Sequence, residues 1–511
     1  KGTDVTYTIA AGDLEGINAF NLGSTVTITA ILEDYAGGAS GTGNTTTGTE
    51  SATTLIIDQA DPAAFSVGAV TTVTEPVVTG KWNIHNTAIT VVVPIATENT
   101  GPTLLNGNVQ IIAKTASSAY ENVGNAVTID AGDRGGNKTL TIAAAALEAI
   151  DNDISDNDVI TISAIITDAA GNKTTGTAST TTLTVDQTPP TIDEVTTDAN
   201  DGLTNPYKVG TTVDIKVSFN EAVVVVEGNN KPALQLDTDD TPGSVLSEAI
   251  YNSGTGSKFP LFRLTVAENN YSEDLNYRAT TSLILNDGTI RDAAGNNATL
   301  TLPALDDAKS LKNKKTLWID GVLPTIKTVG DVTTTGDTIV TSYWNKKNTG
   351  LTVVVPLATT DFSLRSGTIQ LEARAVGGGV TGNWTNIGAV ATMTTETVGA
   401  GTQTISVAKS GTGNPDLEEI NEFSEGDVVT IRAVVTDLAG NSSTFTASNT
   451  TLTVDQTYPS TSTTFKPADA KSALTCCAAD NDDATYGQYW NAKHGAVNIT
   501  VPFKNDPTLA G

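Results

Sequence analysis

The sequence feature that most constrains this chain is a segment that recurs along it. Residues 159–190 read VITISAIITDAAGNKTTGTASTTTLTVDQTPP, and residues 428–459 read VVTIRAVVTDLAGNSSTFTASNTTLTVDQTYP. A looser version comprises residues 291–297 and 317–324, and a degraded one lies within residues 26–62. Self-similarity of this kind indicates that each copy belongs to one folding unit. We therefore expect a row of similar domains.

The unit length follows from the aspartate that ends each copy. These exit aspartates lie roughly 130 residues apart, which is the size of one domain. They are Asp58, Asp186, Asp320 and Asp455. The predicted units are therefore the C-terminal part of a domain at 1–58, whole domains at 59–186, 187–320 and 321–455, and the N-terminal part of a further domain at 456–511. A chain that starts inside one unit and stops inside another is expected to be a fragment of a longer array.

Within each unit, the residue pattern favours short strands over helices. Runs rich in Val, Ile and Thr alternate with turn signals, and the chain has one Met in 511 residues. In the first whole unit we expect strands at 88–94, 109–114, 138–143 and 159–167, with a last strand running unbroken from 172 to 185 and one helical turn at 145–150. In the partial unit at the start we expect a strand at 5–9. Such units are typical of an all-β, two-sheet sandwich.

Composition excludes several classes of partner. Asp and Glu number 57 against 28 Lys and Arg, which gives a formal net charge of −29. Nucleic acids and anionic membranes are therefore not expected to bind. No apolar run is long enough to span a membrane, and the start of the chain has no signal-peptide pattern. Cys476 and Cys477 are adjacent and are the only cysteines, so a disulfide scaffold is excluded; an intermolecular bridge and a pair of small buried residues remain open.

The sequence contains no recognisable catalytic motif. The only histidines, His85 and His494, lie in different units, and there is no P-loop, nucleophile elbow, HExxH or CxxC sequence. Acidic pairs repeated in every unit are typical of a structural device. We therefore expect no enzymatic activity.

Three motifs carry a resemblance to a known family. The TDxAGN turn, the TLTVDQTPPT exit and the VSFNEAV strand end resemble the bacterial immunoglobulin-like repeats of giant surface adhesins and S-layer-type surface proteins. The resemblance covers essentially the whole chain as an array, although residues 474–487 depart from the pattern. It implies a tandem array of immunoglobulin-like (Ig-like) β-sandwich domains in an extracellular, cell-surface setting.

That topology predicts acidic clusters at the joints between domains. The DxAGN turn lies at the pole where the chain enters a domain, whereas the exit aspartate lies at the opposite pole. Each exit aspartate should therefore approach the turn of the next domain: Asp58 approaches Asp168, Asp186 approaches Asp292, and Asp320 approaches Asp437. A third loop at the same pole carries Glu98, Glu221 and Asp361, respectively.

Three carboxylates at one joint would repel one another unless a cation bound between them. Calcium takes six to eight oxygen ligands, and binding to the folded array would stabilise each joint. The sequence thus predicts calcium at the joints, with those nine acidic residues as candidate ligands. The alternative is purely structural, because Asp-x-Ala-Gly-Asn is a good hairpin turn by itself.

Other candidate sites have simpler explanations. The clusters Asp151, Asp153, Asp156 and Asp158, and Asp480, Asp482 and Asp483, lack the pattern of an EF-hand and are expected to be solvated loops. Trp82, Trp344 and Trp490 precede the second strand of three units. Core or joint packing is expected for them, with a carbohydrate platform as the alternative.

The function expected from the sequence is mechanical. The array would form an extended, calcium-stiffened rod, surface layer, sheath or fibre, in which free strand edges could pair with neighbouring copies. Self-association with copies of the chain, or association with other surface components, is therefore expected. One alternative is the stalk of a giant adhesin whose binding tip lies outside this sequence. Another is a glycan-binding module that uses the tryptophans.

Overall fold

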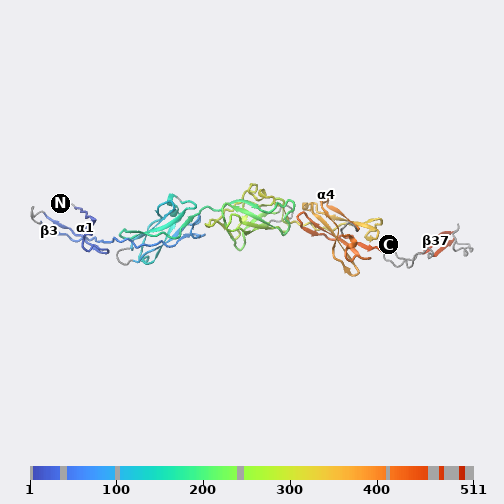
Figure 1. Ribbon diagram of the computed structural model, residues 1–511, viewed down its shortest axis with the longest axis horizontal. Helices are drawn as coiled ribbons and strands as arrows, with labels where there is room; N and C mark the ends of the chain where they lie inside the picture. The colour runs from blue at the N-terminus through green and yellow to red at the C-terminus, as the bar shows by residue number, and fades with distance from the viewer. Residues whose placement is uncertain are drawn as a thin grey trace.

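The computed structural model describes residues 4–34, 43–97, 104–152, 154–238, 247–409, 415–458, 471–476 and 494–500. The chain forms successive β-rich bodies that follow one another along a single line (Figure 1). Three separate hydrophobic cores lie within residues 67–185, 192–319 and 329–454, one in each predicted whole unit. None of the helices in the described ranges has the length and apolarity needed to cross a membrane.

The first whole unit is a sandwich of two mainly antiparallel sheets. A three-stranded sheet has the order β11-β7-β5, and a larger sheet has the order β10-β8-β12-β14-β6 with β9 and β13 at its margins. The strands are β5 (Val70–Val73), β6 (Lys81–Trp82), β7 (Ala88–Pro94), β8 (Asn108–Lys114), β9 (Glu121–Asn122), β10 (Val127–Thr128), β11 (Asn137–Ala143), β12 (Val159–Thr167), β13 (Lys173–Thr175) and β14 (Leu183–Val185). Helix α2 (Ala144–Glu148) and a 3-10 turn at Ile150–Asn152 confirm the expected helical turn.

Alternation of apolar residues explains why these strands form a sandwich. In β7, Ile89, Val91 and Val93 are fully buried, whereas the intervening residues are partly exposed or smaller. In β12, Ile160, Ile162, Ala164 and Ile166 point into the same core. Because successive side chains of a strand face opposite sides, this pattern supplies one apolar face to each sheet.

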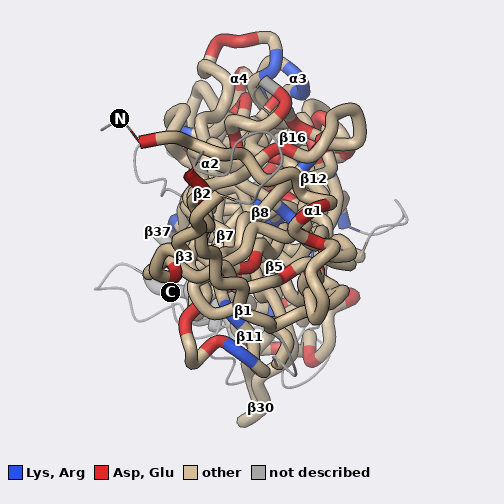
Figure 2. Tube along the Cα trace, turned by 90° about the vertical axis from the view of Figure 1, so that its left-hand side faces the viewer, with Lys and Arg blue, Asp and Glu red and all other residues tan. Residues whose placement is uncertain are grey.

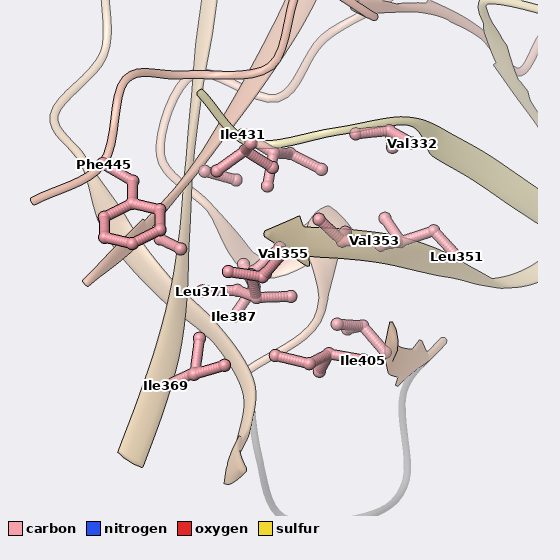
Figure 3. Close-up of a cluster of buried hydrophobic side chains, with 14 of the residues drawn as sticks. Val332, Leu351, Val353, Val355, Ile369, Leu371, Ile387, Ile405, Ile431 and Phe445 are labelled. Carbon is pink, nitrogen blue, oxygen red and sulfur yellow. The ribbon is translucent and has the colours of Figure 1, made fainter. Parts of the chain in front are cut away.

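The third whole unit repeats this plan. Figure 3 shows Val353 and Val355 from one sheet packing toward Ile369 and Leu371 from the other. The two sheets have the orders β26-β28-β32 and β27-β35-β33-β29-β30, with β31 and β34 alongside. Their bounds are β26 (Val332–Gly336), β27 (Tyr343–Asn345), β28 (Asn348–Pro356), β29 (Thr368–Gly377), β30 (Val380–Thr381), β31 (Thr385–Thr392), β32 (Thr402–Ala408), β33 (Val428–Thr436), β34 (Ser442–Thr444) and β35 (Leu452–Asp455). Helix α4 (Thr395–Ala400) and 3-10 turns at Phe362–Leu364 and Leu417–Glu419 connect them.

The second whole unit has a different strand arrangement. Its main sheet has the order β15-β16-β20-β19-β18-β22, with β23 beside β18, and two smaller pairs join β17 to β24 and β21 to β25. The bounds are β15 (Ile192–Thr197), β16 (Thr212–Phe219), β17 (Val224–Val226), β18 (Ala233–Asp237), β19 (Ser247–Ser253), β20 (Leu261–Thr265), β21 (Tyr271–Ser272), β22 (Asn276–Tyr277), β23 (Leu283–Ile284), β24 (Thr289–Arg291) and β25 (Ile319–Asp320), with helix α3 at Leu311–Lys314.

Shorter elements lie on either side of the three sandwiches. The first segment contains α1 (Ala11–Glu15), β1 (Thr25–Val26), β2 (Ile31–Glu33), β3 (Thr45–Thr47) and β4 (Leu55–Ile56), and the last contains β36 (Lys471–Cys476) and β37 (His494–Thr500). Together with the sandwiches, they make an all-β chain, a tandem array of Ig-like domains. The strand expected at 5–9 was wrong: this stretch forms no ladder, and Val5, Tyr7 and Ile9 are exposed. Cys477 and residues 480–483 lie outside the described ranges.

The unbroken last strand predicted for 172–185 was also wrong. β13 ends at Thr175, and β14 begins only at Leu183. Between them, Thr177 donates to Phe65 and accepts from Val67 of the entry segment of the same domain, while Gly176 and Ser179 still donate to β12. The segment still passes from one pole of the sandwich to the other, so the exit aspartate remains opposite the DxAGN turn.

The repeated tryptophans belong to the cores, as the packing interpretation predicted. Trp82 and Trp344 are 0% and 1% exposed. Their indole N–H groups donate to Glu148 at 3.1 Å and to Glu418 at 2.9 Å. Neither ring presents a face to a ligand, which rules out a carbohydrate platform made from these two residues. Trp490 lies outside the described part of the chain.

Candidate metal centres at the domain joints

The DxAGN turn forms a rigid base for each joint. In the second unit, one carboxylate oxygen of Asp292 accepts from the backbone N–H groups of Ala294, Gly295 and Asn296 at 2.7–2.9 Å. Its other oxygen accepts from the side chain of Asn296 at 2.6 Å. Gly295 has φ of +99°, a conformation that glycine adopts without a Cβ penalty. The turn thus fixes an acidic group that is 4% exposed.

The linker from the preceding unit meets this turn. The side chain of Asn296 donates to the backbone carbonyl of Asp186 at 2.8 Å. Glu221 reaches the same place from the loop that follows β16. One ligand oxygen from each of Asp186, Glu221 and Asp292 lies within 4.8 Å of the others, a spacing that a single metal ion can bridge. The structure therefore brings together one of the three predicted triads.

Electrostatics at this joint are unfavourable without a cation. Burial, followed by the charges of Asp292 and Asp156, raises the pKa of Asp186 above its usual value. Burial also raises the pKa of Glu221, with further contributions from Asp292 and Asp186. Both carboxylates are thus held in their charged form at a free-energy cost that a divalent cation would remove.

Asp156 is a joint residue that the sequence interpretation missed. It is exposed, as expected of a loop acid, but its carboxylate accepts from the backbone N–H of Gln187 at 2.7 Å and from the hydroxyl of Thr188. At the end of the third unit, Glu425 makes the same pair of contacts with Gln456 and Thr457. The signal that could have revealed this role is the matching position of the two acids, three residues before the β12 and β33 strands.

The next joint brings Asp320, Asp361 and Asp437 into electrostatic contact. Asp320 is fully buried, and its Oδ2 atom has no hydrogen-bond partner among the described residues. Oδ2 of Asp361 is likewise buried and without a partner. Asp437 is 3% exposed and is held by the backbone and side chain of Asn441 at 2.8 and 2.9 Å. Buried carboxylate oxygens without donors fit the ligand set of a hard cation.

The pKa values of all three acids at this joint are raised. Burial and the charge of Asp437 raise the pKa of Asp320 to about 7. Burial raises the pKa of Asp437 to about 6, although hydrogen bonds from Asn441 act in the opposite direction. Burial is also the main cause of the raised pKa of Asp361.

The first joint is only partly described. The side chain of Asn172 donates to the backbone carbonyl of Asp58 at 3.2 Å and to Asp168 at 2.9 Å, so linker and turn meet as they do at the other joints. Oδ2 of Asp58 is buried and unpartnered. Glu98, the third predicted ligand, lies outside the described residues.

A hydrogen-bonded clamp, centred on the turn asparagine, orients consecutive domains. The side-chain oxygen of Asn296 accepts from the backbone N–H of Ile84 at 3.0 Å, and Asn83 donates to the carbonyl of Ala294 at 2.8 Å. At the next joint, Asn441 accepts from the N–H of Val209 at 3.0 Å. Lys208 donates there to the carbonyl of Gly440 at 3.3 Å. Two joints with different sequences thus share one geometry.

Replacing Asn441 with Ala is expected to destabilise this joint on the order of 2–4 kcal/mol, because each unsatisfied buried polar group costs about 1–3 kcal/mol. The buried carbonyl of Asp320 would lose its donor at 2.9 Å, and the N–H of Val209 would lose its acceptor. Chemical denaturation of the full chain, together with hydrogen exchange at Val209, measures the effect. Asn449→Ala, an exposed asparagine of the same unit, is the matched control. Equal stability of the two variants would contradict the clamp.

The remaining acidic clusters do not form comparable groups. Asp151 accepts from the hydroxyl groups of Thr115 at 2.6 Å and Ser117 at 3.2 Å, and Asp158 accepts from the backbone of Ser155 at 2.8 Å. The Asp158 contact lies within its own loop, and the Asp151 contacts join that loop to the loop after β8, so both are structural contacts within one domain. Asp153, Asp480, Asp482 and Asp483 lie outside the described residues.

Comparisons with known proteins find similar structures but no similar sequence family. No family model matches the chain, and no curated protein sequence is similar to it. Among solved structures, a structure concerning host cell surface retention of a 1.5-MDa bacterial ice-binding adhesin has 15% identity, covers 78% of this chain and all of its own length, and has a TM-score of 0.28. Domains from titin have 13% identity, cover 78% of this chain and 98% of their own, and have a TM-score of 0.24. TM-scores this low give no indication of function.

Proposed function

We propose that this chain is a structural element of an extracellular surface protein, a row of Ig-like domains that divalent cations, calcium above all, stiffen into a rod. The observation that carries the proposal is the convergence of Asp186, Glu221 and Asp292 within 4.8 Å at a boundary between two domains. Because the three acids come from a linker and the domain that follows it, an ion bound there restrains the angle between domains.

The second described joint supports the same proposal. Asp320, Asp361 and Asp437 come from equivalent places, and two of their buried oxygens have no donor. A rod needs every joint to be restrained, and a repeated device at each boundary meets that requirement. The in-line arrangement in Figure 1 is the shape that such restraint would preserve.

Free strand edges favour lateral association of such rods with copies of themselves. β11 pairs only with β7, and β32 pairs only with β28, in the part of the chain that the structure describes. Both ladders run for seven residues without a register shift, and β32 (TQTISVA) carries no charge. An uncharged, unpaired edge is where two chains of net charge −29 can approach and pair.

Small-angle scattering of the full chain tests the proposal. With about 1 mM calcium, well above the affinity range of most protein calcium sites, the chain should scatter as one extended rod. Chelation should shorten the mean end-to-end distance and broaden its distribution, because unscreened acids at the joints repel one another. Magnesium is the control cation, since it demands a smaller octahedral site. Identical curves with calcium and with chelator would contradict the proposal.

A further inference from the structure

A cavity of the second unit lies beside the joint with the third. It encloses about 440 Å³ and is lined mainly by the loop between β15 and β16, with Lys315 and Ala439 closing it from other elements. A second cavity of about 290 Å³ adjoins it, and Tyr207 lines both. The ring of Tyr207 therefore separates two neighbouring cavities.

Tyr207 occupies the position that a buried tryptophan holds in the other two sandwiches. Trp82 and Trp344 lie parallel to the last strand, opposite the residue before the exit aspartate, and Tyr207 bridges Ile319 in the same way. The tryptophan indoles donate to half-buried glutamates, whereas the Tyr207 hydroxyl donates to the carbonyl of Asn200 at 3.0 Å. Tyr207 is only half-buried, so the second unit has replaced a core residue with a ring at the wall of a cavity.

The loop that carries this ring is fixed before any ligand binds. The backbone N–H of Tyr207 donates to Trp318 at 2.9 Å, and Tyr207 accepts from Asp320 at 3.0 Å. Trp318 in turn donates to Asp201 at 3.1 Å. A preformed wall lowers the entropy lost on binding.

Several polar side chains that line the cavity have unused hydrogen-bond donors and acceptors. Asn200, Thr204, Asn205 and Lys315 make no side-chain hydrogen bond or ion pair within the described structure. Amides and hydroxyls that converge around one ring match the alternating hydroxyls and apolar face of a pyranose. The volume of about 440 Å³ is that of a small-molecule site.

The charged residues that line the cavity are two lysines and one aspartate, Asp201, so the lining carries a net positive charge, unlike the chain as a whole. Lys208 and Lys315 both line it, and Lys315 has no acidic partner although acids outnumber bases 57 to 28 along the chain. Figure 2 shows basic segments near α3, which immediately precedes Lys315. At physiological ionic strength, charges beyond about 8 Å are screened, so an anion in the cavity would respond chiefly to Lys208, Lys315 and Asp201, whose net charge is positive.

We propose that this cavity binds an acidic sugar of a surface polysaccharide. The sugar ring packs on Tyr207, its carboxylate pairs with Lys315, and its hydroxyls bond Asn205 and its neighbours. Since Ala439 of the third unit lines the same cavity, the bound sugar contacts both domains of the joint. The second unit is then a polysaccharide contact point within an otherwise structural array.

Titration calorimetry of the full chain with tetragalacturonate, at about 0.15 M salt to screen distant charges, tests the proposal. Saturable binding is expected, and Lys315→Gln should weaken it at least tenfold. Asn205→Ala, which removes an exposed amide without touching the loop backbone, should weaken it severalfold. Lys309→Gln, an exposed lysine of the same unit, should leave binding unchanged.

Three outcomes would overturn the proposal. They are no saturable binding of tetragalacturonate, an equal loss in Lys309→Gln, and equally tight binding of a neutral tetrasaccharide such as maltotetraose. An equal loss in the control would show that net charge alone attracts the anion. None of these outcomes bears on calcium at the acidic joints, so this experiment does not test the proposed function.

Discussion

Replacing Glu221 with Gln should have opposite effects with and without calcium. In chelator, the variant is expected to be more stable than the wild type, because it removes a carboxylate whose pKa is raised by burial and by Asp292 and Asp186. In calcium, it should lose most of the metal-dependent stabilisation, because the ion loses a charged ligand. Glu221 has no hydrogen bond of its own in the described structure, so the substitution leaves the local fold intact.

The size of the calcium effect follows from mass action. At a calcium concentration 100 times the Kd, binding stabilises the native state by about 2.7 kcal/mol. A variant with a hundredfold weaker site would gain only about 0.4 kcal/mol at the same concentration. Thermal unfolding of the full chain at several calcium concentrations measures both values. Asp287→Asn, which removes an exposed acid of the same unit, should behave as the wild type; a loss of the calcium response in that control would contradict the assignment.

The metal-free chain should lose stability at the joint of Asp320 and Asp437 as the pH rises from about 4 to 8. Both groups have a folded-state pKa above the unfolded value of 3.8, about 7 for Asp320 and about 6 for Asp437. The folded state therefore binds more protons than the unfolded state, and its stability falls as those protons leave. For Asp320 alone, the loss is on the order of 4 kcal/mol, at about 1.36 kcal/mol per pKa unit.

Asp320→Asn removes the carboxylate with the larger raised pKa at this joint. The amide retains an oxygen to accept from the backbone N–H of Val322, as Oδ1 of Asp320 does at 3.1 Å. Denaturant titrations from pH 4.5 to 8 should show that the free energy of unfolding of the variant rises relative to that of the wild type as the pH rises. Saturating calcium should remove the wild-type loss. A metal-free wild type that becomes more stable over this range would contradict the account.

Local patterns in the sequence were sufficient to predict most of the sandwich. β7 and β12 begin and end where the alternation of Val and Ile begins and ends, because burial of one face fixes both the register and the limits of a strand. The segment from 172 to 185 was mispredicted because it also bonds the entry segment at Phe65 and Val67, which is distant in sequence. The stretch 5–9 alternates in the same way, but it has no partner strand in the described structure.

The joints were predictable where a turn fixes the backbone. Asp-x-Ala-Gly-Asn determines its own geometry, and the repeat length places each exit aspartate at the following turn. The role of Asp156 at the joint was not predicted. Its partners, Gln187 and Thr188, are reached through a loop whose path the sequence does not specify. The cavity at Tyr207 was also unpredictable, since it depends on the aligned position of Trp82 in a unit with little sequence similarity.

The most direct test of the central claim is a crystal structure of the calcium-loaded chain with anomalous scattering from calcium, or from terbium in its place. The account predicts an anomalous peak between the carboxylates of Asp186, Glu221 and Asp292, with the ion at 2.3–2.6 Å from oxygen as calcium requires. Density confined to other acidic loops, with the three joint carboxylates hydrated and apart, would contradict it.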